Sequence, residues 1–378
     1  MALSKKVLHI TNVAFGLPYF LGDQIEYLKS NDIISTIACS KSSLLDKYVE
    51  QHNINKFEVQ VVRKIDVIAD LKAIFKLVKF IRQEKFDYVI GHTPKGALLA
   101  MIASWLSGTK NRIYFRHGLV FETSQGFKLK LMIFLERLTS SLATQIVNVS
   151  NSILQVSLKN GFGNNVKNIV LGNGTCNGVD TLKYVRSGKD SALTKRISIP
   201  EGNIVVGFVG RLVNDKGINE LVEAWKLLVK KYNNITLLLV GPFEERDALS
   251  NEVISFINNE ESIIVTGFVN NSQPYYNVMD IFILPSYREG FPTVVLEASS
   301  MKLPIITTKS TGCVDSIKEN MTGIFTTINS IDIKDKIEYY IENYDIRLNH
   351  GKNGRVWIEE NFKQETIWKE IKEKVYNL

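Results

Sequence analysis

The chain is poor in cysteine and lacks a long apolar run. Its three cysteines, Cys39, Cys176 and Cys313, lie far apart in a chain of 378 residues. Such a set forms neither a disulfide framework nor a metal-binding motif, so a reducing cytoplasm is the expected compartment. The longest apolar run, residues 97–106, is shorter than the roughly 20 residues needed to span a bilayer. No apolar stretch follows the N-terminal lysines, so no signal peptide is expected.

The charges are unevenly distributed, although the net charge is only +7. Residues 1–175 carry 22 Lys and Arg against 12 Asp and Glu, or +10, whereas residues 176–378 carry 24 against 27, or −3. A basic first half indicates an anionic partner such as a lipid head group or a diphosphate. A solvated basic face is the alternative. No nucleic-acid-binding motif is present, so nucleic acid is not an expected partner.

Short β-branched runs alternate with helical patterns along the whole chain, as in a soluble α/β protein. The expected strands of the first half are residues 7–11, 33–38, 57–62, 88–91, 112–115 and 145–149. Those of the second half are residues 204–210, 235–241, 263–266, 281–285 and 304–307. This alternation predicts two doubly wound, Rossmann-like domains with parallel sheets, facing each other across a cleft. Ligands of such sheets bind at the carboxyl ends of the strands.

Loop signals place the expected domain boundary near residues 172–202. The predicted organisation is a first domain over 1–175, a linker over 176–202, a second domain over 203–357 and a C-terminal helix over 358–378. Aromatic and aliphatic residues recur at helical spacing in that last segment.

A loop rich in glycine and cations follows the first strand of the second half. Gly210 and Arg211 end the strand, and Lys216 precedes the next helix. Glycine lets the backbone pass close to a phosphate, Arg211 can hold that phosphate in a fork, and Lys216 adds a point charge. Alone, such a pattern is also consistent with two solvated cations.

Two carboxylates eight positions apart, Glu289 and Glu297, flank the expected start of a helix. Pro292 suits the first helical position. The N–H groups of Thr293, Val294 and Val295 then offer an anion site, which the helix dipole strengthens. The alternative is that Glu289 only favours the helix start and that Glu297 is an exposed helix acid.

The segments GFVGRLVNDKG and SYREGFPTVVLEA resemble the donor-site motifs of family 4 retaining glycosyltransferases (glycosyl transferases group 1), which have the GT-B fold. Further matches are GNG…NGVD at 172–180, a Gly-Phe-Val turn at 267–269, and residues 311–315 with Gly323. The resemblance covers the whole chain and implies a C-terminal helix that crosses back to the N-terminal domain. It also implies a metal-independent, cofactor-free reaction, and the chain has no Asp-x-Asp motif.

The resemblance assigns roles to individual residues. Arg211 and Lys216 are expected to bind the diphosphate, Glu289 the transferred sugar and Glu297 the ribose hydroxyls. The remaining donor-site residues implied by the family are Gly16, Gly210, Phe268, Gly290, Phe291, Pro292, Thr293 and Val294. Gly16 stands where the family often has a glycine pair.

The first half offers polar residues at two strand ends. His117 follows one strand, where the family places a histidine that faces the donor sugar; a structural histidine is the alternative. His92, Lys95 and Arg116 are the expected acceptor-binding residues, with the phosphate held by Lys95 and helix N–H groups. For the segment at 92–96, helix capping by Thr93 is an equal alternative.

Two helical patterns, residues 65–84 and 126–142, combine apolar residues with lysines and arginines. We expect this basic, apolar region to dock on the inner face of the cytoplasmic membrane and reach a polyprenyl-diphosphate-linked saccharide. A buried helix or a dimer contact is the alternative.

The sequence and the resemblance together predict a retaining hexosyltransferase of capsule, O-antigen or exopolysaccharide assembly. Its expected donor is a UDP-hexose or UDP-N-acetylhexosamine. Two other functions remain open: a nucleotide-sugar 2-epimerase of the same fold, and a non-catalytic nucleotide-sugar-binding protein.

Overall fold

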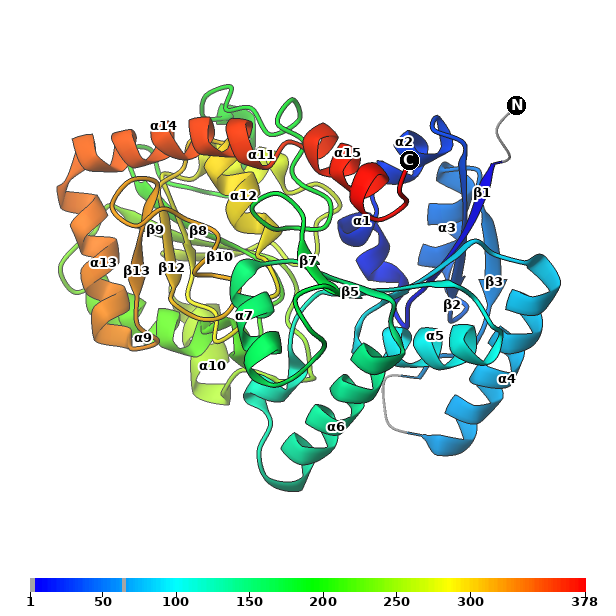
Figure 1. The fold of residues 1–378 in the computed structure, drawn as a ribbon. Helices are drawn as coiled ribbons and strands as arrows, with labels where there is room; N and C mark the ends of the chain where they lie inside the picture. The colour runs from blue at the N-terminus through cyan, green and yellow to red at the C-terminus, as the bar shows by residue number, and fades with distance from the viewer. Residues whose placement is uncertain (1–3, 63–65) are drawn as a thin grey trace. The chain divides into compact units, whose positions relative to one another are not determined.

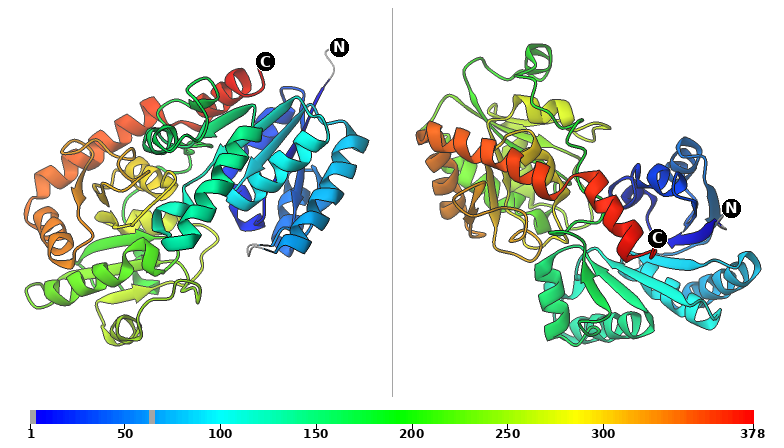
Figure 2. Two further views of the ribbon diagram at one scale, coloured as in Figure 1. Left: turned by 60° about the horizontal axis from the view of Figure 1, so that its bottom comes forward. Right: turned by 45° about the horizontal axis from the view of Figure 1, so that its top comes forward.

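The computed structural model describes residues 4–62 and 66–378, which divide into two compact units. The first unit comprises Met1–Gly178 together with Gln364–Leu378, and the second comprises Val179–Lys363. Each unit is a parallel sheet with helices packed on it, as the doubly wound pattern predicts (Figures 1 and 2).

The first unit contains a seven-stranded sheet of order β3-β2-β1-β4-β5-β6-β7. Its strands are β1 (Lys5–Ile10), β2 (Ile33–Cys39), β3 (Asn55–Glu58), β4 (Tyr88–His92), β5 (Asn111–Arg116), β6 (Gln145–Asn148) and β7 (Asn168–Val170). Every pairing is parallel, with Ile10 opposite Ala38 on one side and Gly91 on the other. The carboxyl ends of β1, β4 and β5 therefore lie at one edge of this sheet.

The helices of the first unit lie between its strands along the chain, except α15, which is the last element of the chain. They are α1 (Leu17–Phe20), α2 (Gln24–Lys29), α3 (Ser43–Gln51), α4 (Val67–Glu84), α5 (Pro94–Leu106), α6 (Gly126–Leu142), α7 (Asn151–Lys159) and α15 (Gln364–Lys374), with short 3-10 turns η1 (Ala14–Gly16) and η2 (Val120–Thr123). The expected helix over 126–142 is confirmed. The expected helix over 65–84 is observed as α4; its first expected residue, Ile65, lies outside the described residues.

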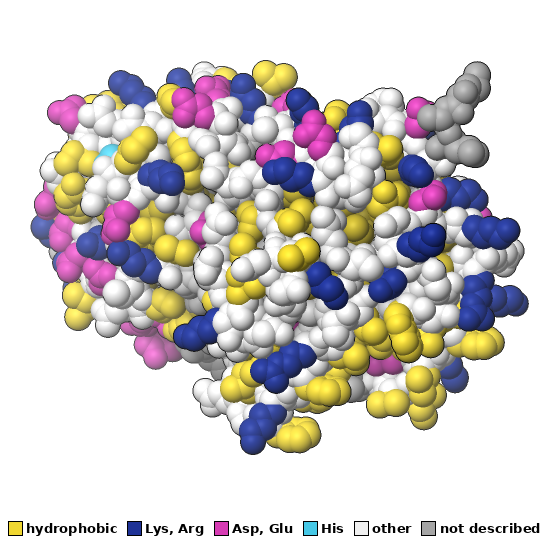
Figure 3. Space-filling view, viewed as in Figure 1, with side chains coloured by type: hydrophobic (Ala, Val, Ile, Leu, Met, Phe, Trp, Pro, Cys, Tyr) yellow, Lys and Arg dark blue, Asp and Glu magenta, His cyan; other side chains and the backbone are white. Residues whose placement is uncertain are grey.

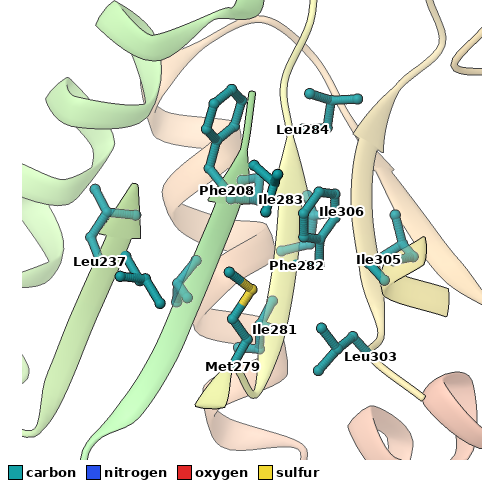
Figure 4. Packing of buried hydrophobic residues seen from close by; sticks show 14 of the residues in the cluster. Phe208, Leu237, Met279, Ile281, Phe282, Ile283, Leu284, Leu303, Ile305 and Ile306 are labelled. Carbon is teal, nitrogen blue, oxygen red and sulfur yellow. The ribbon is translucent and has the colours of Figure 1, made fainter. Parts of the chain in front are cut away.

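The second unit contains a six-stranded parallel sheet of order β10-β9-β8-β11-β12-β13. Its strands are β8 (Ile204–Val209), β9 (Ile235–Val240), β10 (Ile263–Val265), β11 (Ile281–Leu284), β12 (Ile305–Thr308) and β13 (Gly323–Thr326). Figure 4 shows how Phe208, Met279 and Phe282 pack among the aliphatic side chains of this sheet. The central strands are buried on both faces, as their continuous apolar runs require.

The helices of the second unit are α8 (Ser191–Arg196), α9 (Ile218–Leu228), α10 (Asn251–Asn259), α11 (Gln273–Val278), α12 (Thr293–Ser300), α13 (Ser330–Glu342) and α14 (Tyr344–Asn361), with the turn η3 (Asn214–Lys216). Helix α8 lies within the segment expected to be a linker. The loops after β8 and β11 carry the two sequence motifs of this unit. Because both strands are parallel neighbours, these loops meet at one edge of the sheet.

The expectation of one continuous C-terminal helix over 358–378 is wrong, because this segment is divided between two helices. Helix α14 ends at Asn361, and α15 begins at Gln364. Helix α15 belongs to the first unit, which confirms the expected return of the chain (Figure 2). There, Trp368 Nε1 donates to Asn177 Oδ1 at 2.7 Å, and Lys372 Nζ donates to Asn31 Oδ1 at 2.8 Å.

Candidate functional site

Two loops of the second unit are joined by ion pairs. The ammonium group of Lys216 pairs with Glu289, and only 17% and 15% of the two side chains are exposed. Beside them, Arg288 Nη2 lies 2.9 Å from Asp215 Oδ2. Two ion pairs therefore hold the loop after β8 against the loop after β11. The first loop supplies the cation of one pair, and the second loop supplies the cation of the other.

Arg211 lies in the loop two residues after β8 and is less enclosed than Lys216. Its side chain is 44% exposed, and Nη1 lies 2.7 Å from Glu244 Oε2. Gly210, just before it, has a φ of +151°. An exposed pair of this kind contributes little to stability, so the Arg211 guanidinium can exchange its partner for an incoming anion.

Gly312 allows a close backbone approach behind Glu289. Its φ is +80°, and an added Cβ would lie 2.6 Å from the carbonyl oxygen of Glu289. The N–H of Glu289 donates to the carbonyl of Thr311 at 3.0 Å. The Thr311–Gly312 turn thus holds the Glu289 loop in place, which gives a physical reason for the glycine.

Helix α12 begins at Thr293, and Pro292 occupies its N-cap rather than its first helical position. The expectation of three free N–H groups is wrong for Val295, whose N–H donates to the carbonyl of Pro292 at 2.9 Å. The N–H groups of Thr293 and Val294 make no hydrogen bond to any of the described residues. These two groups are the ones that an anion can use.

Glu297 is buried on α12 and is not an exposed helix acid. Its Oε2 accepts the hydroxyl of Tyr276 at 2.7 Å. Burial raises its pKa, and hydrogen bonds from Tyr276, Tyr184 and Ser272 oppose that rise. Tyr276 therefore orients a carboxylate that the sequence pattern already singles out. Tyr276 lies in no motif, so sequence analysis alone does not identify it.

Two aromatic residues of the expected donor set differ in exposure. Phe268 is 73% exposed. Phe291 is half-buried, and its ring lies 5.5 Å from that of Phe362. Gly290 precedes Phe291, and its carbonyl would also be in contact with a Cβ at Gly312.

Three histidines form a hydrogen-bonded chain in the first unit. His9 Nδ1 lies 3.1 Å from His92 Nε2, and His92 Nδ1 lies 2.9 Å from His117 Nε2. Burial lowers the pKa of His9 to about 3 and that of His117 to about 3. Burial, followed by the neighbouring rings, also lowers the pKa of His92. All three rings are therefore neutral at pH 7.

Phe20 covers this chain. Its ring stacks on His117 with the centroids 4.0 Å apart and on His92 at 5.8 Å. An added Cβ on Gly16 would lie 2.6 Å from the Phe20 ring. Gly16, which the resemblance places in the donor site, is buried and makes room for Phe20, so packing also explains this glycine.

Arg116 does not line an acceptor site, contrary to expectation. Its side chain is fully buried, and the guanidinium donates to Glu136 Oε1 at 2.8 Å. Further donors reach Asn148 and Asn168 at 2.7 and 3.1 Å and Ser140 at 2.7 Å. A guanidinium with these partners is not available to a ligand. Its position at the carboxyl end of β5 favours a ligand role, but its side chain supports the packing of α6 on the sheet.

The other two expected acceptor residues are also enclosed. His92 is 1% exposed. Lys95 forms an ion pair with Asp70 of α4, and only 12% of its side chain is exposed. Thr93 Oγ1 accepts the N–H of Gly96 at 3.3 Å, so the capping alternative is observed. Contacts within the protein therefore explain all three residues expected to bind the acceptor. His117, in contrast, is partly exposed.

Within residues 4–62 and 66–378, no three His, Cys, Asp or Glu side chains are grouped so as to hold a metal ion. None of the described helices is long and apolar enough to cross a bilayer.

Comparisons with known proteins agree with the two motifs. Residues 190–357 match the family described as Glycosyl transferases group 1, and residues 6–151 match that described as Glycosyl transferase 4-like. The Staphylococcus aureus capsular polysaccharide biosynthesis glycosyltransferase CapM is 31% identical over 99% of this chain and 97% of its own length.

A second relative names its substrates. The Escherichia coli UDP-Gal:alpha-D-GlcNAc-diphosphoundecaprenol alpha-1,3-galactosyltransferase is 27% identical over 82% of this chain and 80% of its own. Among solved structures, Anabaena Alr3699/HepE in complex with UDP and glucose covers 100% of both chains with a TM-score of 0.81 and 20% identity. At that identity the likeness concerns the fold, which is GT-B.

Proposed function

Because the chain belongs to the glycosyl transferases group 1 family and is a glycosyltransferase of polysaccharide biosynthesis, we propose that it transfers a sugar with retention of configuration. The proposed donor is a UDP-hexose or UDP-N-acetylhexosamine, and the proposed acceptor is a hydroxyl of a polyprenyl-diphosphate-linked saccharide. Support for this acceptor comes from the name of the E. coli relative, which includes diphosphoundecaprenol.

The observation that carries the proposal is the Lys216–Glu289 pair between the loops that follow β8 and β11. A cation and a carboxylate side by side suit a ligand with a diphosphate at one end and hydroxyl groups at the other. Lys216 and the exposed Arg211 would bind the diphosphate, together with the N–H groups of Thr293 and Val294. Glu289 would then accept hydrogen bonds from the sugar, and Glu297 from the ribose.

The proposed reaction needs no enzymic nucleophile. The bond between sugar C1 and the diphosphate oxygen breaks, and the acceptor oxygen forms its bond to C1 on the same face. The acceptor's proton passes to the departing phosphate oxygen. Arg211 and Lys216 stabilise the negative charge that develops on that oxygen, so the proposal includes no metal ion. His117 orients the sugar by a hydrogen bond.

A donor panel tests the proposal. The protein is incubated with UDP-, GDP- and ADP-sugars, with and without polyprenyl-diphosphate-linked saccharides in detergent, and nucleotide release is measured. We expect release of one nucleotide that depends on the acceptor, with retained configuration in the product. The Arg211→Ala and Glu289→Ala proteins should lose this activity.

Lys309→Ala is a control in the same unit, because Lys309 is 63% exposed and its contacts, an ion pair with Glu319 and a cation–π contact with Phe325, do not include the proposed donor-binding residues. Full activity of Glu289→Ala would refute the site assignment. Conversion of the nucleotide-sugar without an acceptor would indicate an epimerase. Nucleotide binding without any turnover across the panel would favour a binding protein.

A further inference from the structure

His9 lies at the inner end of the histidine chain and has an unpaired ring nitrogen. The residue is 1% exposed, and its Nε2 is buried without a hydrogen-bond partner. At the other end, His117 Nδ1 makes no hydrogen bond within the described part of the chain, and His117 is only partly buried. The chain of three rings therefore connects a closed interior to an open strand end.

The chain of neutral rings has only two possible polarities. Each neutral imidazole carries one proton, so each ring donates through one nitrogen and accepts through the other. If the rings donate inward, His9 Nε2 must carry a buried proton without an acceptor. If they donate outward, His9 Nδ1–H donates to His92, His92 Nδ1–H donates to His117, and His117 Nδ1 carries a proton that faces outward.

The sealed environment of His9 favours the outward polarity. Buried N–H groups without an acceptor are rarer in proteins than buried acceptors without a donor. In the outward arrangement, His9 Nε2 is only a bare lone pair. A single proton lies in each of the two contacts, which are 3.1 and 2.9 Å long. The tautomer of His9 therefore determines that of His92, and the tautomer of His92 determines that of His117.

We propose that His9 and His92 are positioning residues that fix the tautomer of His117, so that its outward Nδ1–H is a hydrogen-bond donor. Phe20 holds the ring plane of His117 by stacking. This inference rests on the proposed function only for the group that accepts this hydrogen bond, which is an oxygen atom of the transferred sugar. The tautomer itself is a property of the free protein.

Nuclear magnetic resonance of the protein labelled with ¹⁵N-histidine tests the tautomer without any substrate. The chain has five histidines, so one variant per ring assigns the spectrum. We expect His117 of the unchanged protein to carry its proton on Nδ1. A proton on Nε2 of His117 would overturn the proposal, whatever the donor or acceptor of the enzyme is.

Variants of His9 test the transmission along the chain. In His9→Phe the ring keeps its approximate volume but loses both nitrogens, and we expect His117 to become a mixture of tautomers. In His9→Asn the amide nitrogen replaces Nδ1 as a donor, and we expect the outward polarity to return. His52→Phe is the control, because His52 contacts Glu26 and is not one of the three hydrogen-bonded histidines. An unchanged His117 tautomer in both His9→Phe and His92→Phe would refute the coupling.

Transfer kinetics give an independent readout. We expect kcat to fall about fivefold in His9→Phe, as for the loss of one neutral hydrogen bond, and to recover in His9→Asn. A merely structural role for His9 predicts no such recovery, because asparagine fills the space less well than phenylalanine. Equal losses in both variants, with an unchanged His117 tautomer, would contradict the proposal.

Discussion

Lys216 and Glu289 form an ion pair although 73 residues separate them in the chain. Their backbones are brought together because β8 and β11 are parallel neighbours whose carboxyl ends lie at the same edge. Because Lys216 is proposed to bind the diphosphate and Glu289 the sugar, removing each charge should weaken the contact with a different part of the nucleotide-sugar. If the two residues only hold the loops together, both changes should have the same effect.

Lys216→Met should lower the affinity for the nucleotide by about 10- to 100-fold, the range expected for a lost charged hydrogen bond. Glu289→Gln should keep nucleotide affinity, because it leaves Lys216 free, and should instead lower transfer. Calorimetric titration with the nucleotide found in the donor panel measures the first effect, and Lys309→Met is the control. Equal losses of nucleotide affinity in both variants would mean that the pair only holds the loops together.

Arg116→Met should lower the free energy of unfolding by about 3–5 kcal/mol, because it leaves the Glu136 carboxylate buried without its partner. Urea unfolding measures this change. The double variant Arg116→Met/Glu136→Gln should recover part of the loss. A loss below about 1 kcal/mol in the single variant would contradict the structural role and return Arg116 to the candidate site.

The sequence predicted the architecture because strand and helix patterns depend on local hydrophobic periodicity. The two Rossmann-like units and the helix over 126–142 follow from that periodicity. Strands β7 and β13 were not predicted. They are three and four residues long and lie at the sheet edges, so they carry little pattern.

Side-chain roles were less predictable than the fold. The motifs identified Lys216 and Glu289, which lie in the loops after β8 and β11, and Glu297, which lies on α12. The parallel pairing of β8 with β11 brings the two loops to the same edge of the sheet. The sequence could not show that the guanidinium of Arg116 points into the interior, because its partners come from α6, β6 and β7. Likewise, His9 and His92 meet only through the pairing of β1 with β4.

Gly312→Ala should impair both folding and transfer. A side chain there is strained at a φ of +80° and would overlap the carbonyl groups of Glu289 and Gly290. We expect a loss of stability of about 1–3 kcal/mol and a displaced Glu289 loop. Gly188→Ala is a matched control, because Gly188 has a φ of +96° but nothing within 4 Å of an added Cβ.

Thermal unfolding and transfer assays of the two glycine variants separate strain from overlap. Strain alone should lower stability similarly in both proteins. Loss of transfer should be confined to Gly312→Ala. Normal transfer in that variant would show that the turn does not position Glu289.

Acid should destabilise the protein through His9. Burial lowers its pKa from 6.5 to about 3, so the unfolded chain binds one more proton between these values. The free energy of unfolding therefore falls as the pH falls below 6.5, by about 1.4 kcal/mol per pH unit for this residue. His9→Phe should flatten the pH dependence by about one proton. Urea unfolding between pH 7.5 and 5.5 measures the slope, and an unchanged slope would contradict a buried neutral His9.

The N-terminal ends of α4 and α6 carry the apolar and basic side chains for which we propose membrane docking. Both ends lie at the bottom of the first unit in Figure 1, and Figure 3 shows hydrophobic side chains interspersed with Lys and Arg there. On α4, Ile68, Leu71 and Phe75 are 69, 61 and 73% exposed, and on α6, Phe127 is 80% exposed. Exposed apolar side chains of this size on one region indicate an interaction surface.

Lysines beside these residues favour an anionic lipid surface over a protein partner. Lys72 and Lys76 are exposed on α4, and each can contribute about 1 kcal/mol near such a surface.

Leu71→Ser/Phe75→Ser should lower binding to vesicles that contain anionic lipid by at least about tenfold, since burial of one such side chain is worth about 1.5–3 kcal/mol. Lys72→Glu/Lys76→Glu should weaken binding to anionic vesicles and leave the weaker binding to neutral ones unchanged. Ile331→Ser, at a 60% exposed position in the second unit, is the control for flotation assays. If the unchanged protein stays in the soluble fraction with anionic vesicles at low salt, the surface has another partner and the acceptor must be reached without docking.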